Sequence, residues 1–170
     1  MSQVYLNGAF MALEEARISP MDRGFLFADG IYEVVPAYNS VLFRFDEHLE
    51  RLERSLREVG ISNPHDRQQW QVLCEELIKR NGGGNLSVYL QITRGAATKR
   101  DHAFPEPPVA PTVFMMTSPI AVPAADSPDT ASGGKAITRD DTRWARCDIK
   151  SISLLPNVLI KQAARSQGAF

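Results

Sequence analysis

Cysteine and histidine are scarce in this sequence of 170 residues, which has only two cysteines and three histidines. Cys74 and Cys147 lie far apart and fit no metal-ligand spacing, so we expect two reduced thiols in a cytoplasmic protein. The histidines, His48, His65 and His102, are too widely separated to suggest a zinc site. The sequence therefore predicts neither a disulfide framework nor a metal centre.

Neither positive nor negative charge dominates, because the sequence has 19 basic and 20 acidic residues and a net charge of −1. A nucleic-acid-binding protein usually carries a basic excess, so this balance argues against that class. No segment approaches the roughly 18 consecutive apolar residues that a membrane-spanning helix needs. No charged-then-apolar signal segment follows Met1. With 44% hydrophobic residues, the composition is that of a globular protein of about one domain.

The common catalytic motifs are also missing. There is no glycine-rich phosphate loop, no paired-histidine metal motif and no Gly-x-Ser-x-Gly elbow. Any catalytic residues must therefore lie outside these common motifs.

Turn residues and hydrophobic periodicity predict strands, then two helices, then strands, which is typical of an α+β domain with an antiparallel sheet. The expected strands are 4–6 and 9–12 around an Asn7-Gly8 turn, 31–38 and 41–45, 86–93, and a central strand at 112–117. The expected helices are 46–59, with Asp46 as N-cap and Gly60 as C-cap, and 65–81. Pro36 cannot donate to a strand ladder, so it predicts an edge strand or a bulge.

Composition changes after this domain. We expect an N-terminal α+β domain over 1–118 and a linker over 119–134, where Pro, Ala, Ser, Asp and Gly dominate. Residues 135–170 read as the start of a second, α/β domain, with a strand at 135–139 and a helix at 156–167. They are too few for an independent core. We therefore expect a truncated chain.

Lys150 is the first candidate for chemistry, because it is a lone lysine in an otherwise apolar run. Its stem could simply reach back to solvent, which is common for lysines. Alternatively, a desolvated amine loses its proton more readily and can attack a carbonyl to form a Schiff base.

Two further candidates are cationic. The segment 93–102 follows a strand, and Arg100 with His102 could clamp a carboxylate, although a solvated basic loop is the plainer interpretation. Arg51 lies early in a capped helix, where free amides and the helix dipole attract anions. The plainer interpretation of Arg51 is a salt bridge with Glu47, one helical turn away.

These residues together resemble class IV (fold type IV) pyridoxal-phosphate aminotransferases, in order and over essentially the whole chain. Within that family, Arg100-x-His102 resembles the D-amino acid (D-alanine) transaminases. The matching segments are Asp22-Arg23-Gly24-Phe25-x-Phe27-x-Asp29-Gly30-x-Tyr32-Glu33-Val34, Glu47-His48-Leu49-x-Arg51-Leu52, Thr93-Arg94-Gly95, Asp148-Ile149-Lys150-Ser151 and Leu154-Leu155-Pro156-Asn157-Val158.

The resemblance implies a role for each matching residue. Lys150 would hold pyridoxal 5'-phosphate (PLP) covalently and then move the substrate's α-proton, and Arg51 would bind the cofactor phosphate. Tyr32, Arg100 and His102 would bind the substrate carboxylate, the last two in the site of the neighbouring subunit of a homodimer.

Tyr89 would lie near the pocket, on the polar face of its strand. The implied reaction is transamination between a D-amino acid, such as D-alanine, and a 2-oxo acid. We expect no nucleic-acid or membrane partner.

Alternatives remain open at this point. A branched-chain L-amino acid transaminase or an aminodeoxychorismate lyase has the same fold, and Arg100-x-His102 is the feature that separates them from the D-specific enzymes. A catalytically inactive fragment is the third possibility. Family members are much longer, and the acid that pairs with the cofactor's ring nitrogen lies beyond residue 170, so we expect the 170-residue chain alone to be inactive.

Overall fold

The computed structural model describes residues 2–121 and 133–169. Contacts between residues divide the chain into two compact units. The first comprises Met1–Ile120 together with Asp148–Ile152, and the second comprises Ala121–Cys147 together with Ser153–Phe170.

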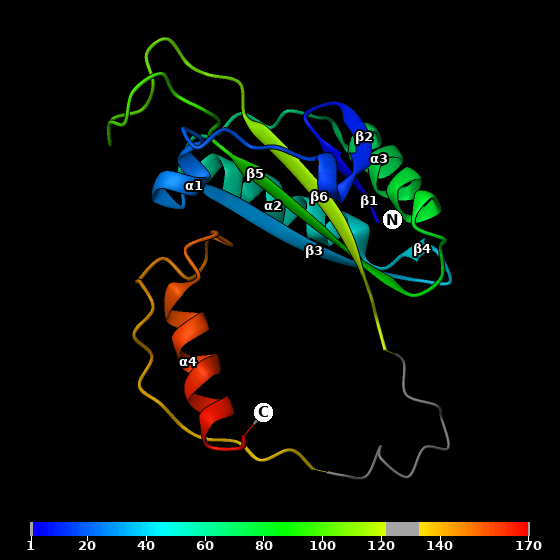
Figure 1. Ribbon diagram of the computed structural model, residues 1–170, viewed down its shortest axis with the longest axis vertical. Helices are drawn as coiled ribbons and strands as arrows, with labels where there is room; N and C mark the ends of the chain where they lie inside the picture. Colours follow the sequence, from blue (N-terminus) through cyan, green and yellow to red (C-terminus); the bar gives the residue numbers. More distant parts are fainter. Residues whose placement is uncertain (1, 122–132, 170) are drawn as a thin grey trace. The chain divides into compact units, whose positions relative to one another are not determined.

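One antiparallel sheet of six strands forms the centre of the first unit (Figure 1), in the order β2-β1-β6-β5-β3-β4. The predicted α+β fold with an antiparallel sheet is thereby confirmed. The strands are β1 (Gln3–Leu6), β2 (Ala9–Ala12), β3 (Gly30–Tyr38), β4 (Val41–Leu42), β5 (Leu86–Thr93) and β6 (Thr112–Pro119).

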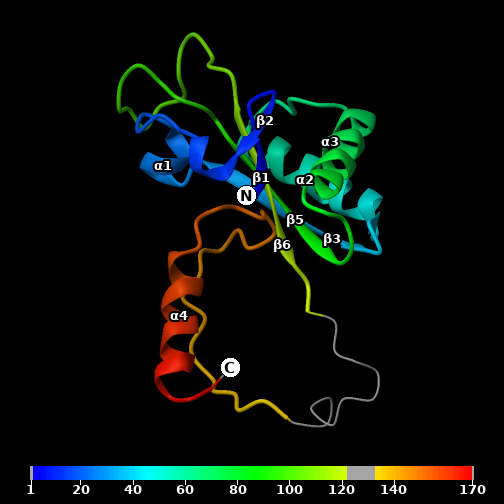
Figure 2. The ribbon, with the colours of Figure 1, turned by 45° about the vertical axis from the view of Figure 1, so that its right-hand side comes forward.

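Two helices, α2 (Phe45–Val59) and α3 (Arg67–Arg80), cover one face of this sheet (Figures 1 and 2). Their apolar stripes bury leucines from α2 and Trp70, Cys74 and Leu77 from α3. Every second residue of β5 joins this core, as the alternation in its sequence predicts. The other face of β5 therefore carries the polar side chains, including Tyr89.

The start of α2 differs from the prediction. The strand expected at 41–45 ends at Leu42, and the helix begins at Phe45 rather than after an Asp46 cap. Phe45 is only 8% exposed and belongs to the core, so burial of its ring favours an earlier helix start. Arg44, with φ of 50°, makes the turn between the two elements. Asp46 instead lies in the first helical turn, where its charge suits the helix dipole.

Pro36 lies inside β3, opposite Ser87 of β5. Its carbonyl accepts a hydrogen bond from Phe43 N–H at 2.9 Å, so its backbone polar groups point away from β5. On that side β4 has already ended at Leu42, and the missing N–H of Pro36 leaves no ladder partner unsatisfied. β3 lies between β5 and β4 in the sheet, so the prediction of an edge strand is wrong. Pro36 is tolerated because β4 is short and ends at Leu42.

Two short helices complete the first unit: η1 (Leu13–Glu15) and α1 (Arg23–Phe27). The Asp22 side chain caps α1 by accepting a hydrogen bond from Gly24 N–H at 2.8 Å. The buried carboxylate also accepts hydrogen bonds from the hydroxyls of Thr93 and Thr112, at 3.0 and 2.6 Å. These contacts anchor the start of α1 to the end of β5 and the start of β6.

In the second unit, the predicted C-terminal helix is present as α4 (Leu155–Ser166). The strand expected at 135–139 is wrong, since these residues form neither strand nor helix. A strand needs a partner for its backbone groups, and the described part of this unit offers no other strand. Most of the expected linker, at 122–132, lies outside the described residues. The contacts between residues group Asp148–Ile152 with the first unit. From the sequence we expected this segment to belong with residues 135–170. The domain boundaries stay a prediction.

Candidate active site

The backbone around Lys150 is fixed along the edge of β3 that β5 does not cover. Tyr32 N–H donates to the Lys150 carbonyl at 3.0 Å, and Ile152 N–H donates to the Gly30 carbonyl at 3.1 Å. Lys150 N–H donates to the Ser55 hydroxyl of α2 at 3.3 Å. The lysine is therefore attached both to the sheet and to the helix that carries Arg51.

The Lys150 side chain reaches the aromatic ring of Tyr32, with its amine nitrogen 3.8 Å from the ring centre. Tyr32 in turn stacks on Tyr89, with ring centres 5.8 Å apart and an interplanar angle of 28°. The Tyr89 hydroxyl donates to Gln91 at 2.7 Å. Burial, and then the nearby Tyr32, raise the pKa of Tyr89, so its phenol stays neutral at physiological pH. The structure thus brings three predicted site residues together.

Arg51 is held by a carboxylate from the sheet. Its Nε and Nη2 donate to the two oxygens of Glu33 at 2.6 and 2.7 Å. Glu33 is 1% exposed, and His48 Nδ1 lies 2.9 Å from one of its oxygens. The hydrogen bonds that Arg51 donates to Glu33 raise the pKa of Arg51, which remains a full cation. The expected pair with Glu47 is not formed, because Glu47 pairs with Arg44 at 2.8 Å.

The remaining guanidinium nitrogen of Arg51, Nη1, has no hydrogen-bond partner among residues 2–121 and 133–169. Two oriented N–H groups and a positive charge are thus available to an anion, as a phosphate requires. Together with the amine of Lys150, this donor set fits a phosphate-bearing aldehyde cofactor. The residues that could hold such a group are Lys150 and Arg51.

Arg100 and His102 meet at a different aromatic ring. The guanidinium carbon of Arg100 lies 5.0 Å from the ring centre of Phe27, and the His102 ring centre lies 5.2 Å from it. Both side chains are exposed. Within the part of the chain that the structure describes, no hydrogen bond, ion pair or ring contact joins either residue to Lys150 or Tyr32.

Glu33, the acid on which the position of Arg51 depends, is not among the site residues that the sequence predicts. A signal existed, because Glu33 alternates with Ile31 and Val35 at the inward positions of the predicted strand. A carboxylate at such a position needs a cationic partner when it is buried. Arg51 supplies it, and His48 Nδ1 lies within hydrogen-bond distance of the same carboxylate.

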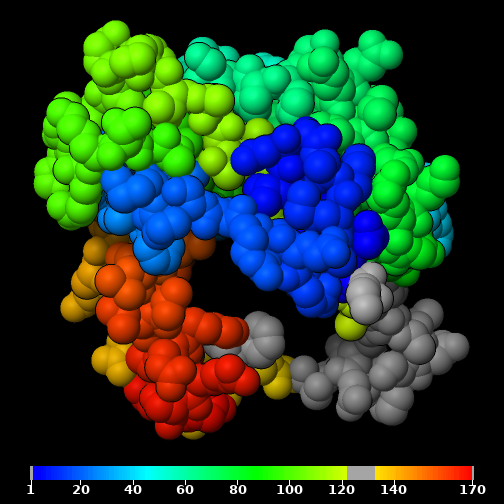
Figure 3. Space-filling view, turned by 45° about the horizontal axis from the view of Figure 1, so that its top comes forward, coloured from blue at the N-terminus to red at the C-terminus, as the bar shows by residue number. Residues whose placement is uncertain are grey.

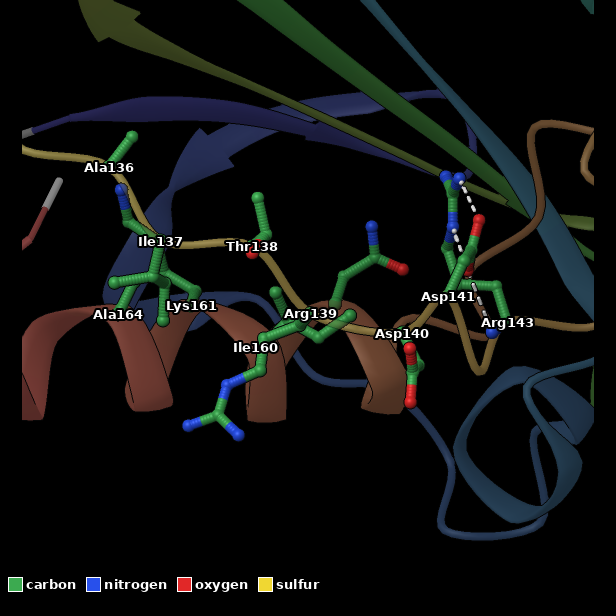
Figure 4. A pocket seen from close by; sticks show the side chains of 11 residues that line it. Ala136, Ile137, Thr138, Arg139, Asp140, Asp141, Arg143, Ile160, Lys161 and Ala164 are labelled. Atoms are coloured by element: carbon green, nitrogen blue, oxygen red, sulfur yellow. Dashed lines mark hydrogen bonds and ion pairs between the residues drawn. The ribbon is translucent and has the colours of Figure 1, made fainter.

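The second unit has a hollow of its own, an open cavity of about 560 Å³ between residues 136–143 and α4 (Figure 4). Its most prominent charged groups, Asp141 and Arg143, pair with each other at 2.7 Å. That ion pair lowers the pKa of Asp141 to about 2. None of the predicted site residues lines this cavity.

Other kinds of site find no support among the described residues. They contain no cluster of three His, Cys, Asp or Glu side chains that could hold a metal ion. Cys74 and Cys147 are free thiols, as predicted. None of the described helices is long and apolar enough to cross a membrane.

A family model described as amino-transferase class IV matches residues 30–170 of this chain. The chain belongs to the class IV aminotransferases. It is 43% identical over 164 residues to a D-alanine aminotransferase of Staphylococcus epidermidis, with 96% of the chain covered. It is 40% identical over 166 residues to that of Staphylococcus aureus, with 96% covered, and 36% identical over 168 residues to that of Listeria monocytogenes, with 99% covered. The chain spans 57% of the length of each of these curated relatives.

Solved structures agree with this fold. A branched-chain amino acid aminotransferase from Escherichia coli superposes with a TM-score of 0.79 at 20% identity, covering 99% of this chain and 56% of its own. The branched-chain aminotransferase of the archaeon Thermoproteus uzoniensis, solved with norvaline, gives 0.76 at 20% identity, covering 98% and 57%. At such identities the likeness shows the class IV aminotransferase fold alone.

Proposed function

We propose that this class IV aminotransferase exchanges an amino group between a D-amino acid, such as D-alanine, and a 2-oxo acid, using PLP. The observation that carries the proposal is the placement of Lys150. Its backbone is fixed by β3 and α2, and its amine lies 3.8 Å from the Tyr32 ring centre. The relatives named D-alanine aminotransferase supply the substrate class.

Each residue of this cluster has a distinct task. Lys150 binds the cofactor covalently and moves a proton through its amine, while Nη1 of Arg51 binds the phosphate. Glu33 keeps the Arg51 guanidinium in one orientation. Tyr89 supports the ring of Tyr32, which contacts both the lysine and the substrate carboxylate. When bound, PLP supplies the electron sink for the reaction.

Arg100 and His102 bind the substrate carboxylate in this proposal. Their exposure and their separation from Lys150 in the described contacts favour action in the site of a neighbouring subunit, which makes the functional protein a homodimer. The free cysteines support a cytoplasmic location.

The experiment uses protein expressed from the complete gene and loaded with PLP. We expect turnover of D-alanine with 2-oxoglutarate on the ordinary enzymatic scale of about 1–1000 per second. Lys150→Ala abolishes it, whereas Lys79→Ala, at an exposed position of α3, leaves it unchanged. Preferential turnover of L-leucine or L-valine would support the branched-chain alternative instead. Release of a product without amino transfer would support the lyase.

Arg100→Ala tests the carboxylate assignment in the same protein. A charge-assisted hydrogen bond is worth about 1.5–3 kcal/mol, so kcat/KM for D-alanine falls about ten- to a hundredfold. The affinity for PLP stays unchanged. An unchanged kcat/KM would reject this role of Arg100.

A further inference from the structure

A buried arginine holds the backbone that carries Arg100 and His102. Arg23 is 4% exposed, and its Nη1 donates to the carbonyls of Asp101 and Ala103 at 2.6 and 3.1 Å. Its Nη2 donates to the carbonyl of His102 at 3.1 Å. Its Nε donates to Asp29 at 2.8 Å. One guanidinium therefore fixes three consecutive carbonyls and is itself fixed by a carboxylate.

An exposed segment does not need these hydrogen bonds from Arg23 to satisfy its backbone carbonyls. Residues 100–103 are all exposed, and water can solvate exposed carbonyls at no cost to the fold. A planar guanidinium presents donors at fixed angles, so it imposes one backbone conformation on its acceptors. A lysine at position 23 has three donors on a single nitrogen and cannot span these carbonyls together with Asp29.

The side chains of the same segment are set by one aromatic ring. Phe27, on α1, is contacted by the guanidinium carbon of Arg23 at 4.9 Å and by that of Arg100 at 5.0 Å from its centre. The His102 ring packs on it edge-to-face, at 5.2 Å and 71°. Figure 3 shows the green chain after β5 lying against the blue α1 region. Arg100 and His102 therefore contact the same Phe27 ring that Arg23 contacts.

We infer that Arg23 and Phe27 are positioning residues that preorganise Arg100 and His102 for the substrate carboxylate. The inference rests on the proposed function. Arg23 fixes the backbone of residues 101–103, and Phe27 fixes the two side chains. Neither residue touches substrate, so their effect is on substrate affinity and not on the proton transfer at Lys150.

Arg94 provides a matched control inside the same network. It is also buried, and it binds both oxygens of Asp29 at 2.8 and 2.9 Å. Its other hydrogen bonds go to the carbonyls of Val59 and Gly60 at the end of α2, at 2.7 and 2.9 Å. Arg94 also lies over the Phe104 ring, 3.6 Å from its centre, and Arg94→Lys keeps a cation there. This variant disturbs the shared carboxylate without removing any hydrogen bond to the carbonyls of residues 101–103.

The first test needs no cofactor. In the 170-residue chain, Arg23→Lys should speed tryptic cleavage after Lys99 and Arg100 about tenfold, because cleavage follows the population of the opened segment. Arg94→Lys should produce no comparable increase at these two bonds. Equal cleavage rates in the parent and Arg23→Lys, or equal increases in both variants, would overturn the inference.

The second test separates positioning from a merely structural role. In PLP-loaded protein from the complete gene, Arg23→Lys should raise KM for D-alanine about tenfold, with kcat within about threefold and PLP affinity unchanged. Phe27→Ala should do the same, and Phe27→Tyr should restore KM because it keeps the ring. Phe25→Ala, at an exposed position of the same helix, should leave KM unchanged.

The outcomes distinguish this inference from the proposed function. A parent protein that does not turn over D-amino acids overturns the proposed function before any variant is made. An active parent whose KM is unchanged in both Arg23→Lys and Phe27→Ala overturns the inference alone. A fall in kcat and PLP affinity along with the rise in KM would show general loosening of the fold, and would also overturn it.

Discussion

At the scale of single residues, Arg51 shows how a distant partner decides the role of a side chain. Its spacing from Glu47 predicts a pair along the helix, yet the guanidinium turns to Glu33 on β3. A buried carboxylate without a cation is far more costly than an exposed one, so Glu33 outcompetes Glu47 for the arginine. Helical spacing cannot reveal such a partner, because it carries no information about which strand the helix covers.

The phosphate assignment of Arg51 leads to a measurable loss of cofactor affinity. Arg51→Ala should weaken PLP binding about ten- to a hundredfold, the range for one lost charge-assisted hydrogen bond. Arg57→Ala is the matched control, since Arg57 lies on the same helix and is exposed. Titration with PLP of each variant, expressed from the complete gene, measures the two affinities. Equal affinities in the two variants would remove Arg51 from the phosphate site.

Glu33 should matter for stability through the same contacts. Glu33→Gln keeps the shape but loses the charge that faces Arg51 and His48. Because the Arg51 side chain is 42% exposed, we expect a moderate loss of about 1–3 kcal/mol in the free energy of unfolding. Urea denaturation measures it. Glu47→Gln, which alters an exposed pair, should unfold like the parent, and a similar midpoint for both variants would contradict this account.

Lys150 was predictable for a simple reason: a lone lysine in an apolar run is conspicuous in any sequence. The structure places its amine against Tyr32, whose own role came only from the resemblance to a family. The catalytic role of Lys150 and the substrate-binding roles of Tyr32 and Tyr89 stay predictions. What the sequence could not reveal is the backbone pairing with β3 that fixes the lysine.

At the scale of elements, local signals predicted what is locally determined. The Asn7-Gly8 hairpin, the Gly60 end of α2 and the alternation of β5 all appear as expected. The errors at 41–45 and 135–139 have different physical causes. Burial of Phe45 starts α2 earlier and ends the strand at Leu42, whereas residues 135–139 have no partner strand in the described part of their unit. Strand formation depends on a partner, and β-propensity alone does not say whether one is present.

Asp29 links three elements. It binds Arg23 of α1 and Arg94, the residue directly after β5. Arg94 in turn binds the end of α2. Burial by itself would raise the pKa of Asp29, but the hydrogen bonds from Arg94 and then Arg23 prevail and lower it. The acid is therefore ionised throughout the neutral range.

Because the pKa of Asp29 is lowered in the folded state, the free energy of unfolding depends on pH in the acidic range. The contribution of Asp29 is complete above about pH 4, near the unfolded value, and is lost as pH falls through the lower folded pKa. Asp29→Asn should lose about 3 kcal/mol at pH 7, since two cations lose their partner, and should show a shallower fall in stability below about pH 4. Unfolding measured between about pH 2 and pH 7 tests both. Parallel curves for parent and variant would contradict the assignment.

At the scale of the whole molecule, the chain spans 57% of the length of its D-alanine aminotransferase relatives. The described part of the second unit contains one helix, and Leu155, Val158 and Leu159 on it are more than half exposed. Such a surface needs further apolar cover. We therefore expect the 170-residue chain alone, given PLP, D-alanine and 2-oxoglutarate, to show no turnover; rates of about 1–1000 per second would contradict this expectation.

The most direct test of the central assignment is chemical mapping of the lysine that carries the cofactor. Protein from the complete gene is incubated with PLP and reduced with borohydride, which makes the bond between lysine and cofactor permanent, and its peptides are then analysed by mass spectrometry. We predict the label on Lys150. A label on Lys79, Lys135 or Lys161, with Lys150 unmodified, would contradict it.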